Sequence, residues 1–311
     1  MAKKIELSWD EKIEKAKEAL KTSFWGDFLC GGLVVSGIFI FIESLELPSF
    51  VNGTIGISLF VFPIFLLFSW FIYLRMKTYR AEMEFKKSSN YINSGKYEKS
   101  LGLLNRLLED KRNLKIKEIW NNKASTLYLL ARYEESLESI NYALEIDPFY
   151  KSALLGKGLL LYYLARFEEA LESFDKVLAI NPTHEGAWNS RGVTLRHLTR
   201  YEEALESFNK ALAIDQIFKE AWMNRGLTLH DLERYEEALE SFNKALTIDQ
   251  NYDEAWYNKA RTESMQNNKD RALESLTKAV NLNNTYREYA KVAKDFDNIR
   301  DSQEFKDLTL S

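Results

Sequence analysis

The residue types that most often carry out catalysis or bind metals are scarce in this sequence and lie apart. The three histidines are His184, His197 and His230, and the one cysteine is Cys30. His197 and His230 share a face in the sequence pattern, but no Cys or carboxylate clearly completes a zinc site with them. Cys30 lies in an apolar stretch, away from any base that could activate a thiol. With no glycine-rich phosphate loop and no zinc spacing, we expect neither an enzyme nor a metal or other cofactor.

Amide side chains, in contrast, recur at a regular interval. Asn224 and Asn258 lie 34 residues apart, and Asn122 and Ser190 fall in the same column, which Gly156 interrupts. An amide both donates and accepts hydrogen bonds, so spaced asparagines can hold an extended peptide backbone without reading its sequence. The alternative is that Asn is simply a tolerated helix residue at these positions.

A repeat of 34 residues places these side chains. The segment Tyr-Glu-Glu-Ala-Leu-Glu-Ser-Phe-Asn-Lys-Ala-Leu begins at Tyr201 and again at Tyr235, with related copies at Tyr133 and Phe167 and a weaker one, offset by 36 residues, at Tyr97. Each unit reads as two helices, and such hairpins bury their apolar faces only by stacking on one another. The predicted units are 81–116, 117–150, 151–184, 185–218, 219–252 and 253–286, followed by a capping helix over 287–311.

Small residues recur where the two helices of a unit should meet. They are Gly158, Gly192 and Gly226 in the first helices, and Ala170, Ala204, Ala238 and Ala272 in the second. Small side chains let two helix axes approach to the short end of the usual range of ~8–10 Å. We therefore expect close packing inside every hairpin.

This pattern resembles the tetratricopeptide repeat family. The residues that carry the resemblance are Trp188, Gly192, Ala204, Phe208 and Ala211, repeated as Trp222, Gly226, Ala238, Phe242 and Ala245. The sequence departs from the family where a large aromatic is usual, at Leu161, Leu195 and Leu229, and where Gln216, Gln250 and Asn284 replace the terminal proline. The resemblance implies an all-α fold, an α-solenoid built as a right-handed superhelix, whose inner groove binds a protein or peptide.

In this family the first helices line the concave surface, which points to a set of binding residues. The candidate peptide-binding residues are Asn122, Asn189, Ser190, Met223, Asn224, Tyr257, Asn258, Arg261, Arg196 and His230. The mixed apolar and aromatic members suit the apolar anchors of a partner. The Lys and Asn set of the family's carboxylate-clamp variety is not reproduced, so the C-terminus of a chaperone is not the leading ligand.

Two apolar stretches precede the repeats. Residues 24–42 hold one charge, Asp27, and residues 55–74 hold none, while the polar residues 43–54 separate them. About twenty helical residues span ~30 Å, the thickness of the hydrocarbon core of a bilayer. The sequence thus predicts a transmembrane helical hairpin with 43–54 as a short external loop. A buried core helix is the alternative for either stretch, and a cleaved signal peptide is another for the first.

Positive charge predicts the orientation of this hairpin. Lys and Arg flank both stretches on their outer sides and are absent between them, a distribution that places the flanks in the cytoplasm. The flanking residues are Lys3, Lys4, Lys12, Lys15, Lys17, Lys21, Arg75, Lys77, Arg80, Lys86 and Lys87. Residues 1–23 are expected to form a cytoplasmic amphipathic helix, with Ser8 and Glu11 as a capping box. This helix could lie on the membrane or pack on the repeats.

Composition excludes some partners and leaves the main hypothesis open to a rival. The net charge is −4 and no basic patch dominates, which argues against nucleic acid. The leading hypothesis is a membrane-anchored scaffold or adaptor whose groove binds a protein partner. The alternative is a structural subunit of a membrane complex in which the two-span hairpin makes the specific contacts. A third possibility is an accessory module that regulates an enzyme in trans.

Overall fold

The computed structural model describes the backbone of residues 54–310 and the side chains of residues 66–309. The predicted amphipathic helix (1–23), first membrane span (24–42) and loop (43–54, apart from Thr54) lie outside the described residues. The chain divides into two units, residues 1–83 and residues 84–311.

The described part of the first unit belongs to the helix α3, Thr54–Asn93, which includes the predicted second span, 55–74. Several of its apolar side chains are open to solvent, with exposed fractions of 64% for Leu67, 61% for Trp70 and 64% for Phe71. The helix runs on without a break, because residues 75–80 contain neither Pro nor Gly. Across the described residues, no helix combines the length and the apolar character needed to cross a membrane.

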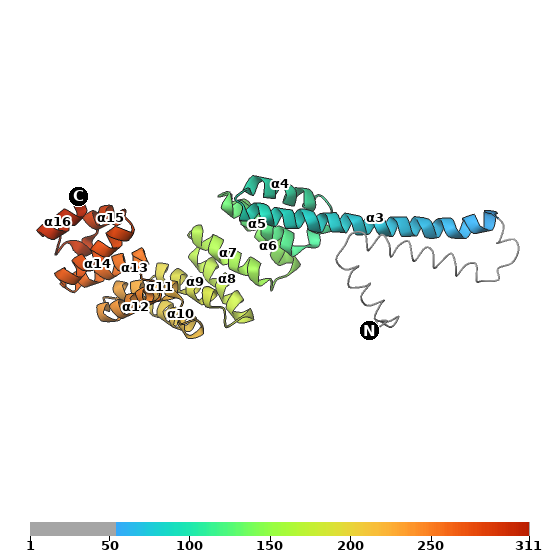
Figure 1. Cartoon of the computed structure of the whole chain (residues 1–311). Helices are drawn as coiled ribbons and strands as arrows, with labels where there is room; N and C mark the ends of the chain where they lie inside the picture. Colours follow the sequence, from blue (N-terminus) through green and yellow to red (C-terminus); the bar gives the residue numbers. More distant parts are fainter. Residues whose placement is uncertain (1–53, 311) are drawn as a thin grey trace, which may run out of the picture. The chain divides into compact units, whose positions relative to one another are not determined.

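The second unit is an all-α array of helix pairs, as the repeat predicted (Figure 1). The end of α3 pairs with α4 (Tyr97–Leu108), and the 3₁₀ turn η1 (Asn113–Lys115) leads to the next pair. The first helices of the following units are α5 (Lys117–Leu129), α7 (Lys151–Tyr163), α9 (Glu185–His197), α11 (Lys219–Asp231) and α13 (Asp253–Met265). The second helices are α6 (Tyr133–Ile146), α8 (Phe167–Ile180), α10 (Tyr201–Ile214), α12 (Tyr235–Ile248) and α14 (Lys269–Leu282).

The break between the two helices of a unit has one structure throughout the array. In the first full unit, the amide of Arg132 donates to the Leu127 carbonyl and that of Ala131 to the Tyr128 carbonyl, both at 2.9 Å. These are the two hydrogen bonds of a Schellman motif, which ends a helix with one left-handed residue. The left-handed residues are Ala131, Ala165, Thr199, Glu233 and Asn267, with φ between 56° and 60°.

The interior of each hairpin confirms the prediction from the small residues. A Cβ atom built on Gly192 would lie 2.6 Å from the ring of Phe208, and Gly158 and Gly226 face Phe174 and Phe242 in the same way. Where the first helix instead carries an alanine, at Ala124 and Ala260, the second helix carries the smaller Ile140 and Leu276 at the corresponding position. Each hairpin therefore conserves its total side-chain volume, as close packing requires.

Between units, the tryptophans at the start of the first helices bind the loop that precedes them. The indole Nε1 of Trp188 donates to the Pro182 carbonyl at 2.8 Å. Trp222 and Trp256 donate in the same way to Gln216 and Gln250, each at 2.9 Å. The bond needs only a backbone carbonyl, which explains why glutamine can replace the terminal proline.

The end of the array differs from the single capping helix predicted for residues 287–311. The structure has α15 (Tyr286–Val292), the 3₁₀ turn η2 (Lys294–Phe296) and α16 (Gln303–Leu310). Ala293 is extended, with ψ of 123°, and the Arg300 guanidinium donates to its carbonyl at 2.7 Å. This turn brings the fully buried Phe296 into the core beside Tyr257. Burial of an aromatic ring thus overrides the helical propensity of the segment.

Candidate functional site

Successive first helices contact one another along the array, from α5 to α13. We call their shared side the first-helix face and define it by the ninth, twelfth and thirteenth residues of each helix, which lie together because helical residues three or four apart are neighbours. These residues are Ser125, Tyr128 and Leu129 on α5; Leu159, Tyr162 and Tyr163 on α7; Val193, Arg196 and His197 on α9; Leu227, His230 and Asp231 on α11; and Arg261, Ser264 and Met265 on α13.

The predicted asparagine column lies at the sixth residue of these helices, and its amides bind the chain itself. Asn224 donates to the side-chain oxygen of Asn189 at 3.0 Å, which joins α11 to α9. Asn122 donates to the hydroxyl of Ser89 at 3.1 Å. Asn258 donates to the Glu254 carbonyl of its own helix at 2.9 Å. Ser190 has no side-chain amide, and its backbone carbonyl accepts from the hydroxyl of Thr194 at 2.8 Å. The column therefore links neighbouring helices and helix turns.

Three of the predicted binding residues have little or no accessible surface. The exposed fraction is 1% for Met223, 9% for Tyr257 and 6% for Asn258. Met223 packs in a core cluster with Leu205, and the ring of Tyr257 stacks on Tyr286 at a centroid distance of 4.6 Å. Met223 and Tyr257, the fifth residues of α11 and α13, thus point into the seams between units. A partner could reach these two side chains only if the array opened.

The charged side chains in the C-terminal half of the face, on α9, α11 and α13, pair within the chain. Nε of Arg196 donates to Asp231 at 2.7 Å. Nε of Arg261 donates to Asp295 in η2, and Nη1 of Arg261 donates to the side-chain oxygen of Asn258 at 2.7 Å. The charges predicted to meet a partner are thus matched by carboxylates of the chain.

His230 belongs to the same paired region. Its Nδ1 shares a hydrogen bond of 2.9 Å with the hydroxyl of Thr262. Burial, assisted by the nearby guanidinium of Arg261, lowers the pKa of His230 below its usual range. The imidazole is therefore neutral at pH 7 and acts as a hydrogen-bonding link between α11 and α13.

A continuous line of rings, which we call the aromatic belt, runs over the N-terminal half of the face and includes the first residues of α6 and α8 and the last residue of α9. It consists of Tyr133, Tyr128, Tyr163, Tyr162, Phe167 and His197. The rings of Tyr128 and Tyr163 meet edge-on at 5.4 Å, and those of Tyr162 and Tyr163 at 6.1 Å. Phe167 stacks on His197 at 5.2 Å. Three consecutive units thus contribute to one aromatic surface.

Part of this surface is open to solvent. The exposed fraction is 62% for Tyr163, 44% for Leu129 and 40% for Leu159. The hydroxyl of Tyr162 and Nε2 of His197 share a hydrogen bond of 2.8 Å. Burial and the charge of Arg196 lower the pKa of His197, so its ring is uncharged at pH 7. The belt and the exposed Leu129 and Leu159 beside it therefore form an uncharged surface with a hydrogen-bonding edge.

The sequence analysis missed most of the belt. It followed the fifth, sixth, ninth and twelfth residues of the first helices, whereas Leu129 and Tyr163 are thirteenth residues. Leu159 is a ninth residue, in the column of Arg261, but it was not singled out. The available signal was the run of aromatic residues at the twelfth and thirteenth positions of two neighbouring units, Tyr128 and then Tyr162 with Tyr163. Within the described residues, no group of three or more His, Cys, Asp or Glu side chains is placed to hold a metal ion.

Comparison with known proteins identifies the repeats. Models of the tetratricopeptide repeat match residues 85–151, 155–216, 220–252 and 241–274, which together make up more than half of the chain. A search of curated proteins finds no match.

Two solved structures show the same architecture, and a third is similar at a lower TM-score. A tetratricopeptide repeat protein from Parabacteroides merdae is 19% identical, with a TM-score of 0.58, over 74% of this chain and 97% of that one. MamA from Desulfovibrio magneticus is 22% identical, with a TM-score of 0.51, over 54% and 96%. YrrB, described as a tetratricopeptide repeat protein with an unusual peptide-binding site, is 25% identical, with a TM-score of 0.47, over 56% and 90%. At these identities the first two similarities concern the fold alone.

Proposed function

Because this chain is a tetratricopeptide repeat protein, we propose that it is a scaffold that binds a protein or peptide partner on its first-helix face, anchored by the aromatic belt. The observation that carries the proposal is the exposure of Tyr163, Leu129 and Leu159 on adjacent first helices. Repeats of this family mediate protein and peptide binding, and exposed rings are the side chains that dominate such interfaces. The partner is expected to present apolar or aromatic side chains in an extended segment or a helix.

The paired half of the face has a different part in this proposal. Arg196, Arg261 and Asn224 would have to exchange an internal hydrogen bond for one with the partner, which yields little net free energy. A partner gains more from covering the belt, where water is released from apolar surface. The C-terminal half therefore sets the geometry of the array, and the N-terminal half supplies affinity.

The test is selection of peptides from a displayed random library on the full-length chain, followed by measurement of their dissociation constants. The Tyr163→Ala variant should weaken binding about thirtyfold, since truncating an anchor residue costs about 2 kcal/mol. Tyr289→Ala is the matched control, because Tyr289 is 56% exposed on α15, outside the first-helix face. Asn224→Ala should have a much smaller effect than Tyr163→Ala. Selected peptides that bind the Tyr163→Ala variant as tightly as the original chain would refute the belt as the anchor.

We also propose that residues 24–42 and 55–74 hold the array at a membrane as a two-span hairpin, with both termini and the repeats in the cytoplasm. The support is the sequence of the two stretches and the exposed apolar side chains of Leu67, Trp70 and Phe71 on α3, which are unfavourable in water. Protease added outside intact cells should spare the repeats. Release of the chain from membranes by alkaline carbonate would contradict the anchor, and digestion of the repeats from outside would contradict the orientation.

A further inference from the structure

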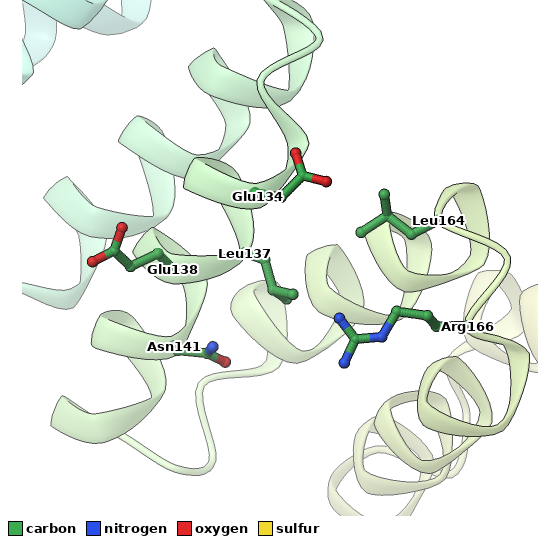
Figure 2. A pocket seen from close by; sticks show the side chains of 6 residues that line it. All are labelled: Glu134, Leu137, Glu138, Asn141, Leu164 and Arg166. Carbon is green, nitrogen blue, oxygen red and sulfur yellow. The ribbon is translucent and has the colours of Figure 1, made fainter.

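Two of the seams between units bring polar and titratable side chains together, and these seams differ in their access to water. The first is a hollow of about 500 Å³ between α6 and the turn that joins α7 to α8, and its polar lining residues are all exposed: Glu134, Glu138, Asn141 and Arg166 (Figure 2). In the second, between α11 and α13, the side chain of His230 is only 10% exposed. Water screens charge where it has access, so the gain of a proton affects packing mainly at the second seam.

The hydrogen bonds around His230 determine which nitrogen of its neutral ring carries the hydrogen. The hydroxyl of Thr262 donates to the Asn258 carbonyl of its own helix at 2.8 Å. A hydroxyl has only one proton to donate, so the Thr262 oxygen must accept from Nδ1 of His230, which lies 2.9 Å away. Nδ1 therefore carries the hydrogen, and Nε2 has a free lone pair.

The surroundings of Nε2 oppose the uptake of a proton. Oδ2 of Asp295 lies 3.9 Å from Nε2, beyond hydrogen-bonding distance, and already accepts from Nε of Arg261. On the α12 side the ring is covered by Tyr235, at a centroid distance of 5.6 Å. The charged groups that act on the ring are two of each sign: Arg196 of α9, Asp231 of α11, Arg261 of α13 and Asp295 of η2. An added proton would therefore leave one uncompensated positive charge in the seam.

The cost of this charge couples the seam to pH. Burial, assisted by the guanidinium of Arg261, holds the pKa of His230 below its ordinary value while the seam is closed. If α13 moves away from α11, the imidazole regains water and its ordinary pKa of ~6.5. The stability of the closed seam is therefore complete at pH values above ~6.5, is lost as the pH falls from there to the lowered pKa, and is constant below that.

From this geometry we propose that His230 is an acid-sensitive link, which holds the last unit on α11 at neutral pH and releases it when Nε2 takes up a proton. The last unit comprises α13 and α14 with the cap formed by α15, η2 and α16. A repeat array suits such a device because each unit contacts mainly its neighbours, so a terminal unit can detach while the others stay folded. The link lies in the C-terminal half of the first-helix face, apart from the aromatic belt.

The first test is NMR spectroscopy of the full-length chain with ¹⁵N-labelled histidine, of which the sequence has three. At neutral pH, Nδ1 of His230 should have the chemical shift of a protonated nitrogen and Nε2 that of an unprotonated one. The titration midpoint of His230 should rise in Arg261→Gln, which removes a repelling cation, and fall in Asp295→Asn, which removes an attracting anion. A hydrogen on Nε2 at neutral pH, or shifts of the midpoint in the opposite directions, would overturn the proposal.

The second test follows the opening of the seam by hydrogen exchange of the full-length chain at about pH 7 and about pH 5. The protection factors of α13 and α14 should fall several-fold relative to those of α7. His230→Asn should lose this pH dependence, because its amide can donate to Thr262 but takes up no proton. His184→Asn is the matched control, since His184 caps α9 by accepting from Ala187 and asparagine can accept in its place.

The ratio of protection at the two pH values within each chain decides the outcome, so a variant that is less stable overall still gives an answer. Glu263 of α13 titrates in the original chain and in both variants, and its contribution therefore cancels from the comparison. An equal ratio in His230→Asn and the original chain would refute the link, as would the same loss of pH dependence in His184→Asn.

Discussion

At the twelfth residue of the first helices, Tyr128 and Tyr162 contribute rings to an open surface, whereas Arg196 donates to Asp231 of the next helix at 2.7 Å. The contact has the same geometry in both halves of the first-helix face, since the twelfth residue of one helix meets the thirteenth of the next. In the N-terminal half the contact joins Tyr128 to Tyr163, and it leaves Tyr163 62% exposed. In the C-terminal half the same contact pairs the charge of Arg196 with that of Asp231.

This difference shows that one backbone arrangement can serve two purposes. A ring in contact with another ring still offers most of its face to a partner, because stacking and edge contacts are not exclusive. A guanidinium in contact with a carboxylate offers little, because its strongest bonds are already made. Under the proposed function, the N-terminal half would bind the partner and the C-terminal half would hold the array together. Four changes can break or sharpen that division.

The largest effect is expected from Asp295→Ala, which removes the carboxylate that accepts from Arg261 and lies near His230. The free energy of unfolding should fall by about 2–3 kcal/mol, because the partly buried guanidinium of Arg261 loses a hydrogen bond to a charged group. Urea denaturation measures the loss, and hydrogen exchange should show that α15 and α16 become less protected. Asp297→Ala is the control: Asp297 is 65% exposed and pairs only with Arg300 at 2.6 Å, so this change should cost little. Equal losses of stability in the two variants would mean that the bond between Arg261 and Asp295 does not hold α15 and α16 on the array.

A smaller effect, of opposite sign, is expected in the core of the last repeat. Glu263 is 4% exposed and stands where the other first helices carry a leucine, such as Leu229; it accepts from Ser275 at 2.6 Å. Glu263→Leu should raise the free energy of unfolding by about 1–2 kcal/mol, since a desolvated carboxylate is replaced by an apolar side chain. Ser275 can then donate to a carbonyl of its own helix, as Ser241 does.

The buried carboxyl of Glu263 should also make the free energy of unfolding depend on pH. Burial raises the pKa of its carboxyl, so the folded state binds a proton more tightly than the unfolded state. The stability is therefore highest at pH values below the unfolded pKa, falls as the pH rises from there to the raised pKa, and is constant above it. Thermal unfolding of Glu263→Leu should lack this contribution. An identical pH profile for the variant would contradict the assignment.

The third change tests whether hairpins in the two halves have the same internal packing. Gly158→Ala in the N-terminal half and Gly192→Ala in the C-terminal half should each lower stability by about 1–2 kcal/mol, because the new methyl group meets a phenylalanine ring. Gly156→Ala is the matched control. Its Cβ would meet only Ile140, at 3.9 Å, so helix propensity should raise stability by up to about 1 kcal/mol. Clearly unequal losses at Gly158 and Gly192 would show that the halves differ inside as well as on the surface.

The smallest effect concerns the turn between the two helices of one unit, α9 and α10. Thr199 is β-branched and left-handed, with φ of 57°, at the end of α9. Thr199→Gly should raise the free energy of unfolding by about 0.5–1 kcal/mol, since glycine adopts this conformation without strain. Asn267→Gly should change it less, because asparagine tolerates the left-handed region. Thermal denaturation compares the two, and a loss of stability in Thr199→Gly would contradict the strain argument.

The fold was predictable because the repeat encodes it locally. Tyr201 and Tyr235 begin second helices as expected, and the pairing of Gly192 with Phe208 follows from residue sizes within one hairpin. The candidate site was predictable only in part. The identity of the first-helix face followed from the family, but the accessibility of Met223 and Asn258 did not, because burial depends on the seam with the next unit.

The sequence by itself determined the period, the helix ends and the small-to-large packing inside each unit, since these depend on residues that lie close together along the chain. It also predicts a two-span anchor, which remains a prediction because residues 1–53 lie outside the described part. The tertiary structure alone decided which side chains remain available. Asn224 is engaged because Asn189 lies within 3.0 Å, and Met223 is buried because it packs with Leu205 of the preceding unit. Such outcomes depend on the reach and fork of side chains between neighbouring helices, which periodicity does not specify.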